Sequence, residues 1–218
     1  MTPPSTLQIK LLSDTTFGRG EGTAGAVDIE VEHDDAGIPF IGGKTIRGLL
    51  RDTWLSMGSL FPKLVPAAKR VLGCSQTMDE VGRLRIGDAL APEKVRDAIG
   101  AAVQRKEKPL PPDTILEAFT AIRYQTAENR RTGAPARTTL RSSRVVLRGF
   151  VFTAPLIWLD AYEPNADDRR CLALCVLATR HAGLLRNRGR GFVEMSLNGN
   201  VAATRADLDV AVAMEPSQ

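Results

Sequence analysis

Three arginines and three glycines near the carboxyl end of the chain form the segment best suited to holding an anion. Residues 183–194 read Gly-Leu-Leu-Arg-Asn-Arg-Gly-Arg-Gly-Phe-Val-Glu, with charges at Arg186, Arg188 and Arg190 and glycines at Gly189 and Gly191. Glycine has no side chain, so the backbone can approach a phosphate closely while the guanidinium groups supply positive charge. The sequence therefore predicts a phosphate-binding loop here.

A second arginine-rich block lies in the middle of the chain, where one acid, Glu128, faces seven arginines: Arg123, Arg130, Arg131, Arg137, Arg141, Arg144 and Arg148. The forked guanidinium group forms paired hydrogen bonds to phosphate oxygens, which suits it to nucleic-acid backbones better than lysine. A solvated loop with an incidental excess of charge is the alternative explanation.

Glycines also mark the amino-terminal part. Gly18, Arg19 and Gly20 lie in a loop over residues 13–25 that holds too many glycines for a helix. Further on, Gly42-Gly43-Lys44-Thr45 precedes an amphipathic helix, and the free N–H groups at a helix start can bind an anion. An ordinary helix-entry turn explains the same residues, and the spacing does not match a Walker loop.

Composition limits the class of protein. The 218 residues fit one domain over residues 1–218, and 43% apolar with 25% charged residues is typical of a globular protein. Aromatic residues make up only 5%, which argues against a surface that binds single strands mainly by base stacking. The first residues resemble neither a signal peptide nor a membrane span, so we expect a cytoplasmic protein with no membrane partner.

Cysteine and histidine offer few alternatives. Cys74, Cys171 and Cys175 lack paired metal spacing, and the last two, four residues apart in an apolar run, are expected to be buried on one helix face. His33 and His181 could act as general acids or bases, but the first lies in an acidic turn and the second ends a predicted helix.

Hydrophobic periodicity predicts how these segments are positioned. Helical spacing indicates helices over residues 45–55, 92–103 and 167–181, with strands over 7–12, 27–32, 84–89, 119–125, 144–158 and 192–197. The last strand is expected to close the fold. Strands interleaved with two amphipathic helices favour an α+β fold of the ferredoxin type. The polar stretch 126–143 has no periodicity and is the long excursion in which function is usual.

The order of these motifs resembles that of the RAMP superfamily of CRISPR-associated proteins. The matching segments cover nearly the whole chain: residues 17–22, 25–28, 37–41, 43–51, 123–126, 132–133, 139–141 and the Gly-Arg loop 183–194. The resemblance implies a ferredoxin-like (RRM-like) antiparallel sheet with helices on one face, plus a β-hairpin thumb inserted at 120–148. One departure is Ile-Gly-Gly-Lys-Thr at 41–45, where the family usually has Pro-Gly-Ser-Ser.

Within that superfamily the chain looks most like a type III effector subunit, of the Csm or Cmr backbone kind or the type III-D kind. The resemblance implies binding to a CRISPR guide RNA, to complementary target RNA and to other effector subunits. The RNA-binding residues that it implies are Gly18, Arg19, Gly20, Lys44, Thr45, Arg47, Arg51, Arg123, Arg130, Arg131, Arg137, Arg141, Arg186, Arg188, Gly189, Arg190 and Gly191.

The resemblance also implies that Asp28 is a catalytic aspartate. It would hold a divalent ion, Mg²⁺, or align the 2′-hydroxyl for attack on the adjacent phosphodiester, in a metal-dependent endoribonuclease acting within the assembled complex. Asp28 could instead cap a turn or pair with an arginine. Two other functions stay open: a non-catalytic capping subunit that binds the 5′ handle of the guide, and a free-standing guide-processing nuclease that uses His33 or His181.

Overall fold

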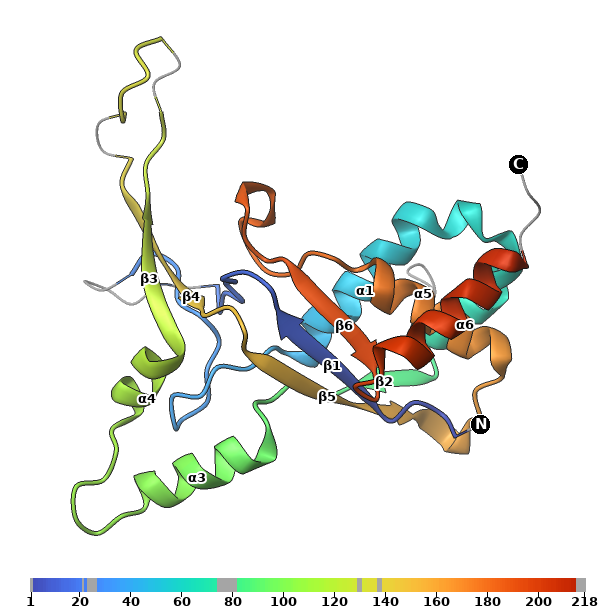
Figure 1. Cartoon of the computed structure of the whole chain (residues 1–218), viewed down its shortest axis with the longest axis horizontal. Helices are drawn as coiled ribbons and strands as arrows, with labels where there is room; N and C mark the ends of the chain where they lie inside the picture. Colours follow the sequence, from blue (N-terminus) through green and yellow to red (C-terminus); the bar gives the residue numbers. More distant parts are fainter. Residues whose placement is uncertain are drawn as a thin grey trace.

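A four-stranded antiparallel sheet forms the centre of the protein, seen in a computed structural model that describes residues 2–20, 22, 27–73, 82–128, 131–136 and 139–214. Its strand order is β2-β5-β1-β6, and Ile9 of the central strand lies opposite Phe152 on one side and Met195 on the other. The strands, visible in Figure 1, are β1 (Thr6–Leu11), β2 (Leu84–Ile86), β5 (Val151–Trp158) and β6 (Val193–Leu197).

Two helices complete a ferredoxin-like arrangement. Helix α1 (Gly43–Met57) connects β1 to β2, and helix α5 (Ala166–Ala178) connects β5 to β6. The resulting β1-α1-β2, β5-α5-β6 order with strand order β2-β5-β1-β6 is that of the ferredoxin fold. The predicted fold class is confirmed.

Alternation along the strands explains which sheet face is covered. In β1, Leu7, Ile9 and Leu11 are buried while Lys10 is exposed. Side chains of a strand point alternately to the two faces, so the buried set packs on the helices and the other set faces outward. Ile46 and Leu50 of α1 belong to the same core cluster. This pattern fixes the roll of α1 against the sheet.

Further helices surround this core. They are α2 (Val65–Leu72), α3 (Glu93–Val103), α4 (Pro112–Phe119) and α6 (Val201–Ala213), with 3₁₀ turns at Gly58–Leu60, Pro62–Leu64, Leu159–Ala161 and Arg186–Arg188. The helix predicted over 92–103 is confirmed, whereas α4 and α6 were not predicted. Helix α6 follows β6, packs against α5, and begins at an Asn200 cap that accepts from the N–H of Ala203. The predicted last strand is confirmed as β6, which completes the sheet, and α6 is an unpredicted addition after it.

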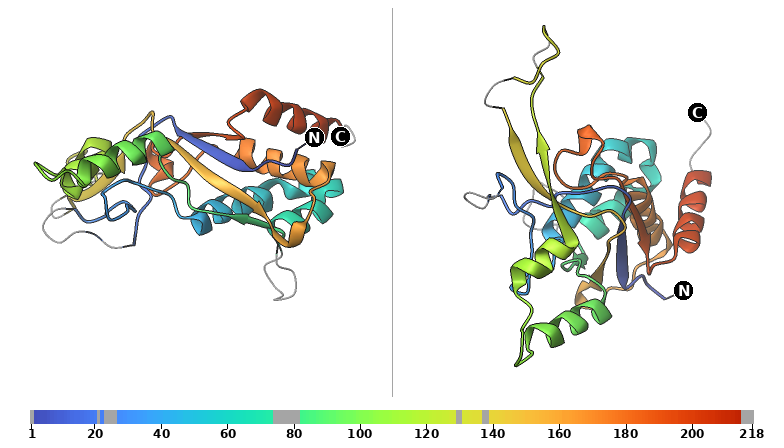
Figure 2. Two further views of the ribbon diagram at one scale, coloured as in Figure 1. Left: turned by 90° about the horizontal axis from the view of Figure 1, so that it is seen from below. Right: turned by 60° about the vertical axis from the view of Figure 1, so that its left-hand side comes forward.

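A hairpin, the thumb, projects from the sheet in Figures 1 and 2. It pairs β3 (Thr120–Gln125) with β4 (Arg141–Val146) in a separate two-stranded sheet. The single strand predicted over 144–158 is therefore wrong, since β4 ends at Val146 and β5 starts at Val151. Gly149 breaks the run: it has a φ of +88°, and its N–H donates to the carbonyl of Leu11 at 2.7 Å.

The segment predicted as a strand at 27–32 does not join the four-stranded sheet. Its backbone instead forms isolated bridges, with Val31 opposite Gly18 and Ile29 parallel to Ser143 of β4. The N–H of Arg144 donates to the carbonyl of Ile29 at 2.9 Å. The alternation that predicted a strand thus reflects a segment that lies along the base of the thumb.

Two smaller expectations are also decided. The turn predicted at 34–37 forms, with Asp34 Oδ1 accepting from the N–H groups of Ala36 and Ile38.

Cys171 and Cys175 are buried and unpaired on α5. The hydrogen bond with the Cys175 thiol, and then burial, raise the pKa of Cys171. None of the helices within the described residues is long and apolar enough to cross a membrane.

A buried ion pair joins the 27–32 segment to the thumb. Arg144 Nε donates to Glu30 Oε1 at 2.8 Å, and the two side chains are 12% and 3% exposed. The same Glu30 oxygen accepts from the N–H of Val31, and the hydroxyl of Thr16 donates to the carbonyl of Arg144. Charges removed from water in this way are costly unless paired, so the pair fixes which elements can meet here.

We predict that Glu30→Ala destabilises the protein by about 3–5 kcal/mol, because it leaves the Arg144 charge buried without its carboxylate. A decrease in Tm of roughly 10 °C by differential scanning calorimetry is expected for a chain of this size. Arg83→Ala is the matched control: its partner Asp160 is 75% exposed, so less than about 1 kcal/mol should be lost. Equal losses in both variants would contradict the prediction.

Candidate nucleic-acid interface

The Gly-Arg turn, residues 182–191, lies against the base of the thumb. Arg190 Nη1 donates to the hydroxyl of Ser143 on β4 at 2.9 Å. With its amide oxygen turned toward Arg190, Gln125 of β3 accepts from both terminal nitrogens of that side chain at 2.9 and 3.2 Å. Two arginine-rich segments that are well separated in the sequence therefore share one surface, since Ser143 and Arg190 are 47 residues apart.

One carboxylate holds this surface together. Asp14 Oδ2 accepts from Arg123 Nε and Nη2 at 3.0 and 2.7 Å, and Asp14 Oδ1 accepts from the N–H of Arg148. Desolvation lowers the pKa of the nearby Arg190, Asp14 opposes that effect, and Arg123 adds to it. Arg123 and Arg190 therefore lie near the one carboxylate of Asp14 and repel each other. Two positive charges near one negative charge leave this surface net positive.

The glycines of the turn serve two different purposes. Gly191 has a φ of +75°, and a Cβ there would lie 2.2 Å from the carbonyl oxygen of Ala182. Gly189 has a φ of +74°, and nothing lies within 4 Å of an added Cβ. Gly191 is therefore required by the packing of the chain on itself, and of these two glycines only Gly189 leaves backbone open to a ligand.

A groove lies between α1 and the Gly-Arg turn. This groove, the α1 groove, has a volume of about 660 Å³. Leu49 and Phe17 contribute apolar surface, and Arg186 and Arg188 lie on the side of the Gly-Arg turn. The full lining is Thr16, Phe17, Gly18, Glu32, Thr45, Gly48, Leu49, Asp52, Gly183, Leu184, Leu185, Arg186 and Arg188. The amino-terminal half of α1 and the Gly-Arg turn therefore meet at this groove.

Carboxylates of the chain itself occupy the start of α1, where the sequence suggested an anion site. The N–H of Gly43 donates to Asp88 Oδ1 at 2.8 Å. Glu32 lies on the other side of this turn, where a Cβ on Gly42 would be 3.5 Å from Oε2. Negative charge is favoured at a helix start, so the carboxylate of Asp88 takes the place that a phosphate would fill. The alternative of an ordinary helix entry fits better.

The basic side chains of α1 do not line the groove. Arg47 Nη2 donates to the carbonyl of Leu72 at 2.9 Å, which directs it toward the end of α2. Lys44 is exposed and Arg51 half-buried, and neither is among the lining residues. Of the expected RNA-binding residues on this helix, only Thr45 lies in the α1 groove.

The other expected RNA-binding residues are spread around this surface. Arg19, Gly20, Arg131 and Arg141 are exposed, and the N–H of Arg19 donates to the carbonyl of Glu30. Arg130 and Arg137 lie outside the described residues. The histidines are separate from the arginine cluster around Asp14: His33 Nδ1 contacts the carbonyl oxygen of Asp34, and the ring of His181 packs on Phe192.

Asp28 is held at the base of the thumb. Its Oδ2 accepts from the N–H and the hydroxyl of Ser142 at 2.6 and 3.0 Å, and its own N–H donates to that hydroxyl. The backbone bond and then the hydroxyl bond from Ser142 hold the pKa of Asp28 below its ordinary value, desolvation opposes them, and Arg141 adds a still smaller lowering. The carboxylate is exposed and ionised, and it stands beside Ser143, the partner of Arg190.

Asp28 forms no metal site with other described residues. Within the part of the chain that the structure describes, there is no group of three His, Cys, Asp or Glu side chains able to hold an ion. Mg²⁺ often binds one or two carboxylates and completes its six ligands with water and substrate phosphate. Asp28 could supply one such ligand.

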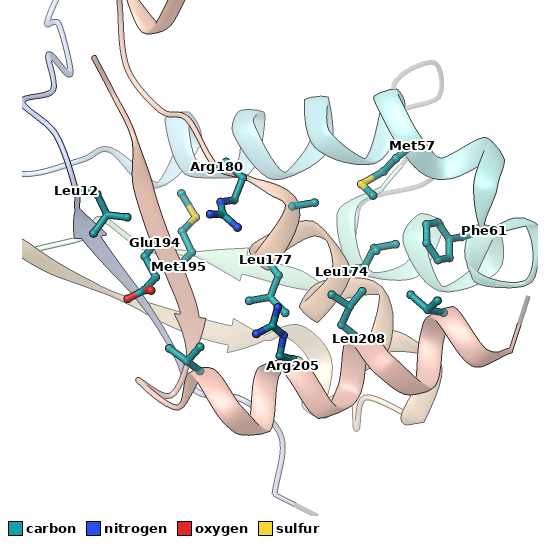
Figure 3. Close-up of a pocket in the computed structure, with 13 residues that line it drawn as sticks. Leu12, Met57, Phe61, Leu174, Leu177, Arg180, Glu194, Met195, Arg205 and Leu208 are labelled. Atoms are coloured by element: carbon teal, nitrogen blue, oxygen red, sulfur yellow. The ribbon is translucent and has the colours of Figure 1, made fainter. Parts of the chain in front are cut away.

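Two smaller cavities continue the α1 groove along the helix. One, of about 380 Å³, shares Leu49, Asp52 and Arg186 with the groove. The next, of about 550 Å³, shares Ala178 and Arg180 with that cavity and lies between α1, α5, β6 and α6, as Figure 3 shows. Its walls include Phe61, Leu174 and Leu208, so this end is mainly apolar and less suited to phosphate.

Comparison with known proteins identifies the family. A sequence model of the RAMP superfamily matches residues 8–194. The chain belongs to the RAMP superfamily. No curated protein matches it significantly.

Solved structures share the fold of this RAMP protein at low sequence identity. A chain of type III-B Cmr-beta in the apo state is 14% identical with a TM-score of 0.63, over 90% of this chain and 98% of that chain. A chain of type III-B Cmr-beta bound to cognate target RNA is 11% identical with a TM-score of 0.63, over 95% and 99% of the two chains.

Sequence reasoning missed the acidic members of this RAMP surface. Asp14 anchors Arg123, while Glu32 and Asp52 line the α1 groove. Asp52 could have been found, because Thr45, Leu49 and Asp52 follow the spacing of one helix face. No local pattern marks Asp14 or Glu32, whose partners lie far away in the sequence.

We predict that Ser142→Ala raises the pKa of Asp28 toward the ordinary value of 3.8, because one of its hydrogen bonds is lost. A carboxyl with a lowered pKa stabilises the fold above its unfolded-state pKa, and that contribution is lost as the pH falls through the folded-state value. Carboxyl ¹³C NMR titration measures the shift. Ser56→Ala on α1 is the control, and an equal pKa of Asp28 in wild type and Ser142→Ala would contradict the assignment.

Proposed function

We propose that this RAMP protein is a guide-RNA-binding backbone subunit of a type III CRISPR effector complex. The observation that supports this most directly is the junction of the Gly-Arg turn with the thumb base, where Arg190 and Arg123 lie near the carboxylate of Asp14. Such a surface suits the sugar-phosphate backbone of RNA, because phosphate contacts need charge and donors but no particular base. The fold shared with chains of type III-B Cmr-beta supports the same proposal.

In this proposal, base pairing between guide and target carries the sequence specificity, and the protein holds the guide by its backbone. The scarcity of aromatic residues, 5% of the chain, agrees with binding through phosphate rather than through stacking. The projecting thumb would contact the RNA or a neighbouring subunit.

We predict that Arg186→Gln with Arg188→Gln weakens single-stranded RNA binding and lowers its dependence on salt. Both side chains are exposed on the α1 groove, so the fold should tolerate their loss. Each phosphate contact to a single strand contributes about 0.7 to the slope of log K against log salt, so the slope should fall by about 1.4. Fluorescence anisotropy across a salt series measures it.

Arg83→Gln with Arg85→Gln is the matched control, since these exposed arginines lie at β2, outside the described lining of the groove. Both double variants remove the same charge. Equal slopes in the two would show that net charge, rather than this surface, binds the RNA. Arg190 is left intact because its bonds to Ser143 and Gln125 also hold the turn.

Cleavage of target RNA at Asp28 is a second part of the proposal. An exposed, ionised carboxylate at the thumb base could align the 2′-hydroxyl with the adjacent phosphodiester. Any Mg²⁺ would be held between Asp28 and the phosphate oxygens of the RNA, because the described residues contain no group of three side chains that could hold the ion. The rival proposal is a non-catalytic subunit that binds the 5′ handle of the guide, and the two bonds from Ser142 favour it by giving Asp28 a structural use.

Asp28→Asn separates these two roles. The amide oxygen can still accept from the N–H and hydroxyl of Ser142, while the charge is lost. If Asp28 is catalytic, Asp28→Asn in the assembled complex should reduce target-RNA cleavage at least 100-fold and leave guide binding unchanged, since positioning and charge account for factors of this order. Denaturing gel assays with and without EDTA measure the cleavage and its need for a metal.

Asp28→Ala removes both the charge and the Ser142 bonds. Cleavage by Asp28→Asn at the wild-type rate, with guide binding weakened only in Asp28→Ala, would reject catalysis and support the handle-binding subunit. A free-standing nuclease would require cleavage of precursor RNA by the isolated chain and its loss on changing His33 or His181.

A further inference from the structure

The two sides of the α1 groove differ in chemistry. The Gly-Arg turn contributes Arg186 and Arg188, both exposed, to one side. The other walls carry the carboxylates of Asp52, from α1, and of Glu32, from the segment after β1, and the hydroxyl of Thr45 lies on the same helix face as Asp52. A groove for phosphate alone would gain nothing from carboxylates, which repel it. The lining therefore suits a ligand that is anionic at one end and a hydrogen-bond donor at the other.

The two carboxylates are available to such a ligand. Within the described residues, neither the Glu32 nor the Asp52 side chain takes part in an ion pair or a hydrogen bond with another side chain. By contrast, Asp14, Glu30 and Asp168 elsewhere in the chain each pair with an arginine. Ionised carboxylates only accept hydrogen bonds, so Glu32 and Asp52 can bind only hydrogen-bond donors of a ligand.

Space for a flat group comes from a glycine on α1. Gly48 lies in the middle of the helix, lines the groove, and has nothing within 4 Å of an added Cβ. Glycine inside a helix is unfavourable compared with alanine or leucine, so packing within the protein does not explain its presence. Leu49, Leu184 and Phe17 supply apolar surface to the same groove.

We propose that the α1 groove holds one unstacked nucleotide of the bound RNA and prefers guanine. The phosphate would contact Arg186 and Arg188, the base would lie over Gly48 and Leu49, and its donor edge would face the carboxylate of Asp52 or that of Glu32. This inference rests on the proposed RNA binding and adds a base preference to it.

Guanine fits the carboxylates best. Its Watson–Crick edge has two adjacent N–H donors, at N1 and N2, and both can bond to one carboxylate. Cytosine and adenine each present one exocyclic amino group, and uracil has only its N3–H between two carbonyl oxygens that a carboxylate repels. The expected order is guanine first, then cytosine and adenine, then uracil. Paired hydrogen bonds discriminate between bases by about tenfold or more.

The first measurement is the affinity of the full-length chain for RNA hexamers. The reference is hexauridylate, and each of its positions is changed in turn to guanine, cytosine or adenine. Fluorescence anisotropy at fixed salt should give about tenfold tighter binding for guanine at one position, and less for cytosine or adenine. Equal affinity for all hexamers would overturn the inference and leave the proposed RNA binding intact. No affinity for any hexamer would overturn both.

Gly48→Leu tests the place of the base. Leucine is a good helix former, so Tm should stay the same or rise, while the side chain fills the groove. The preference for guanine should disappear, and affinity for hexauridylate should fall less than threefold. Gly100→Leu on α3 is the matched control, because nothing lies within 4 Å of a Cβ there either. A guanine preference that survives Gly48→Leu would reject this groove as its source.

Asp52→Asn and Glu32→Gln test the recognition itself. Each removes negative charge close to Arg186 and Arg188, so affinity for hexauridylate should rise slightly while the guanine preference falls to below threefold. A purely structural role would lower both affinities together. Asp97→Asn on α3, also exposed, is the control for the loss of one charge. Retention of the guanine preference in both groove variants would overturn the assignment.

Discussion

The buried pairing of Glu30 with Arg144 is the interaction on which the rest of the surface depends. It joins the loop after β1 to the first strand that returns from the thumb, at a place where neither charge meets much water. Around it, Ile29 runs parallel to Ser143, and Thr16 bonds to the carbonyl of Arg144. Since an unpaired charge here would be costly, the loop and the thumb must be positioned together.

This constraint explains how so basic a surface stays ordered. Arginines close to one another repel, and each needs either solvent or a carboxylate. The Asp14 carboxylate accepts hydrogen bonds from the guanidinium of Arg123 and from the N–H of Arg148, just after β4. The backbone carbonyl of Asp14 accepts from the N–H of Gly191 in the Gly-Arg turn. Arg144 is withdrawn into the protein, and Arg186 and Arg188 are left exposed. The arginines thus fall into two groups: Arg123 and Arg144 form contacts that build the surface, and Arg186 and Arg188 are exposed to a ligand.

Much of the fold could be predicted from the sequence, because its signals are local. Alternation in β1 and helical spacing in α1 and α5 follow from burial of one face, and these elements with β2, β5 and β6 make the ferredoxin-like core. The errors have local causes too. Gly149 breaks one predicted strand into two, and the alternation at 27–32 belongs to a segment beside β4 rather than to the sheet.

The candidate site could be predicted only in part. Composition located the Gly-Arg turn and the arginines of the thumb. It could not show which arginines form contacts inside the protein and which are left for a ligand. Arg47 reaches the carbonyl of Leu72, and Arg144 reaches Glu30, through contacts between residues far apart in sequence. The carboxylate of Asp88 at the start of α1 was not foreseen for the same reason, because Asp88 follows β2 and is 45 residues from Gly43 in the sequence. The carboxylates of the α1 groove became visible only with the fold.

The thumb is attached to the sheet in a way that bears on how this family can diversify. Leu90 pairs with Thr153 through two backbone hydrogen bonds, and the chain returns to the sheet at Val151, so the whole excursion starts and finishes at neighbouring positions of one strand. Lengthening a loop whose ends are already fixed costs little entropy. Insertions and deletions at the tip should therefore alter its reach without disturbing the core, which makes hairpin length an independent variable for evolution and for engineering.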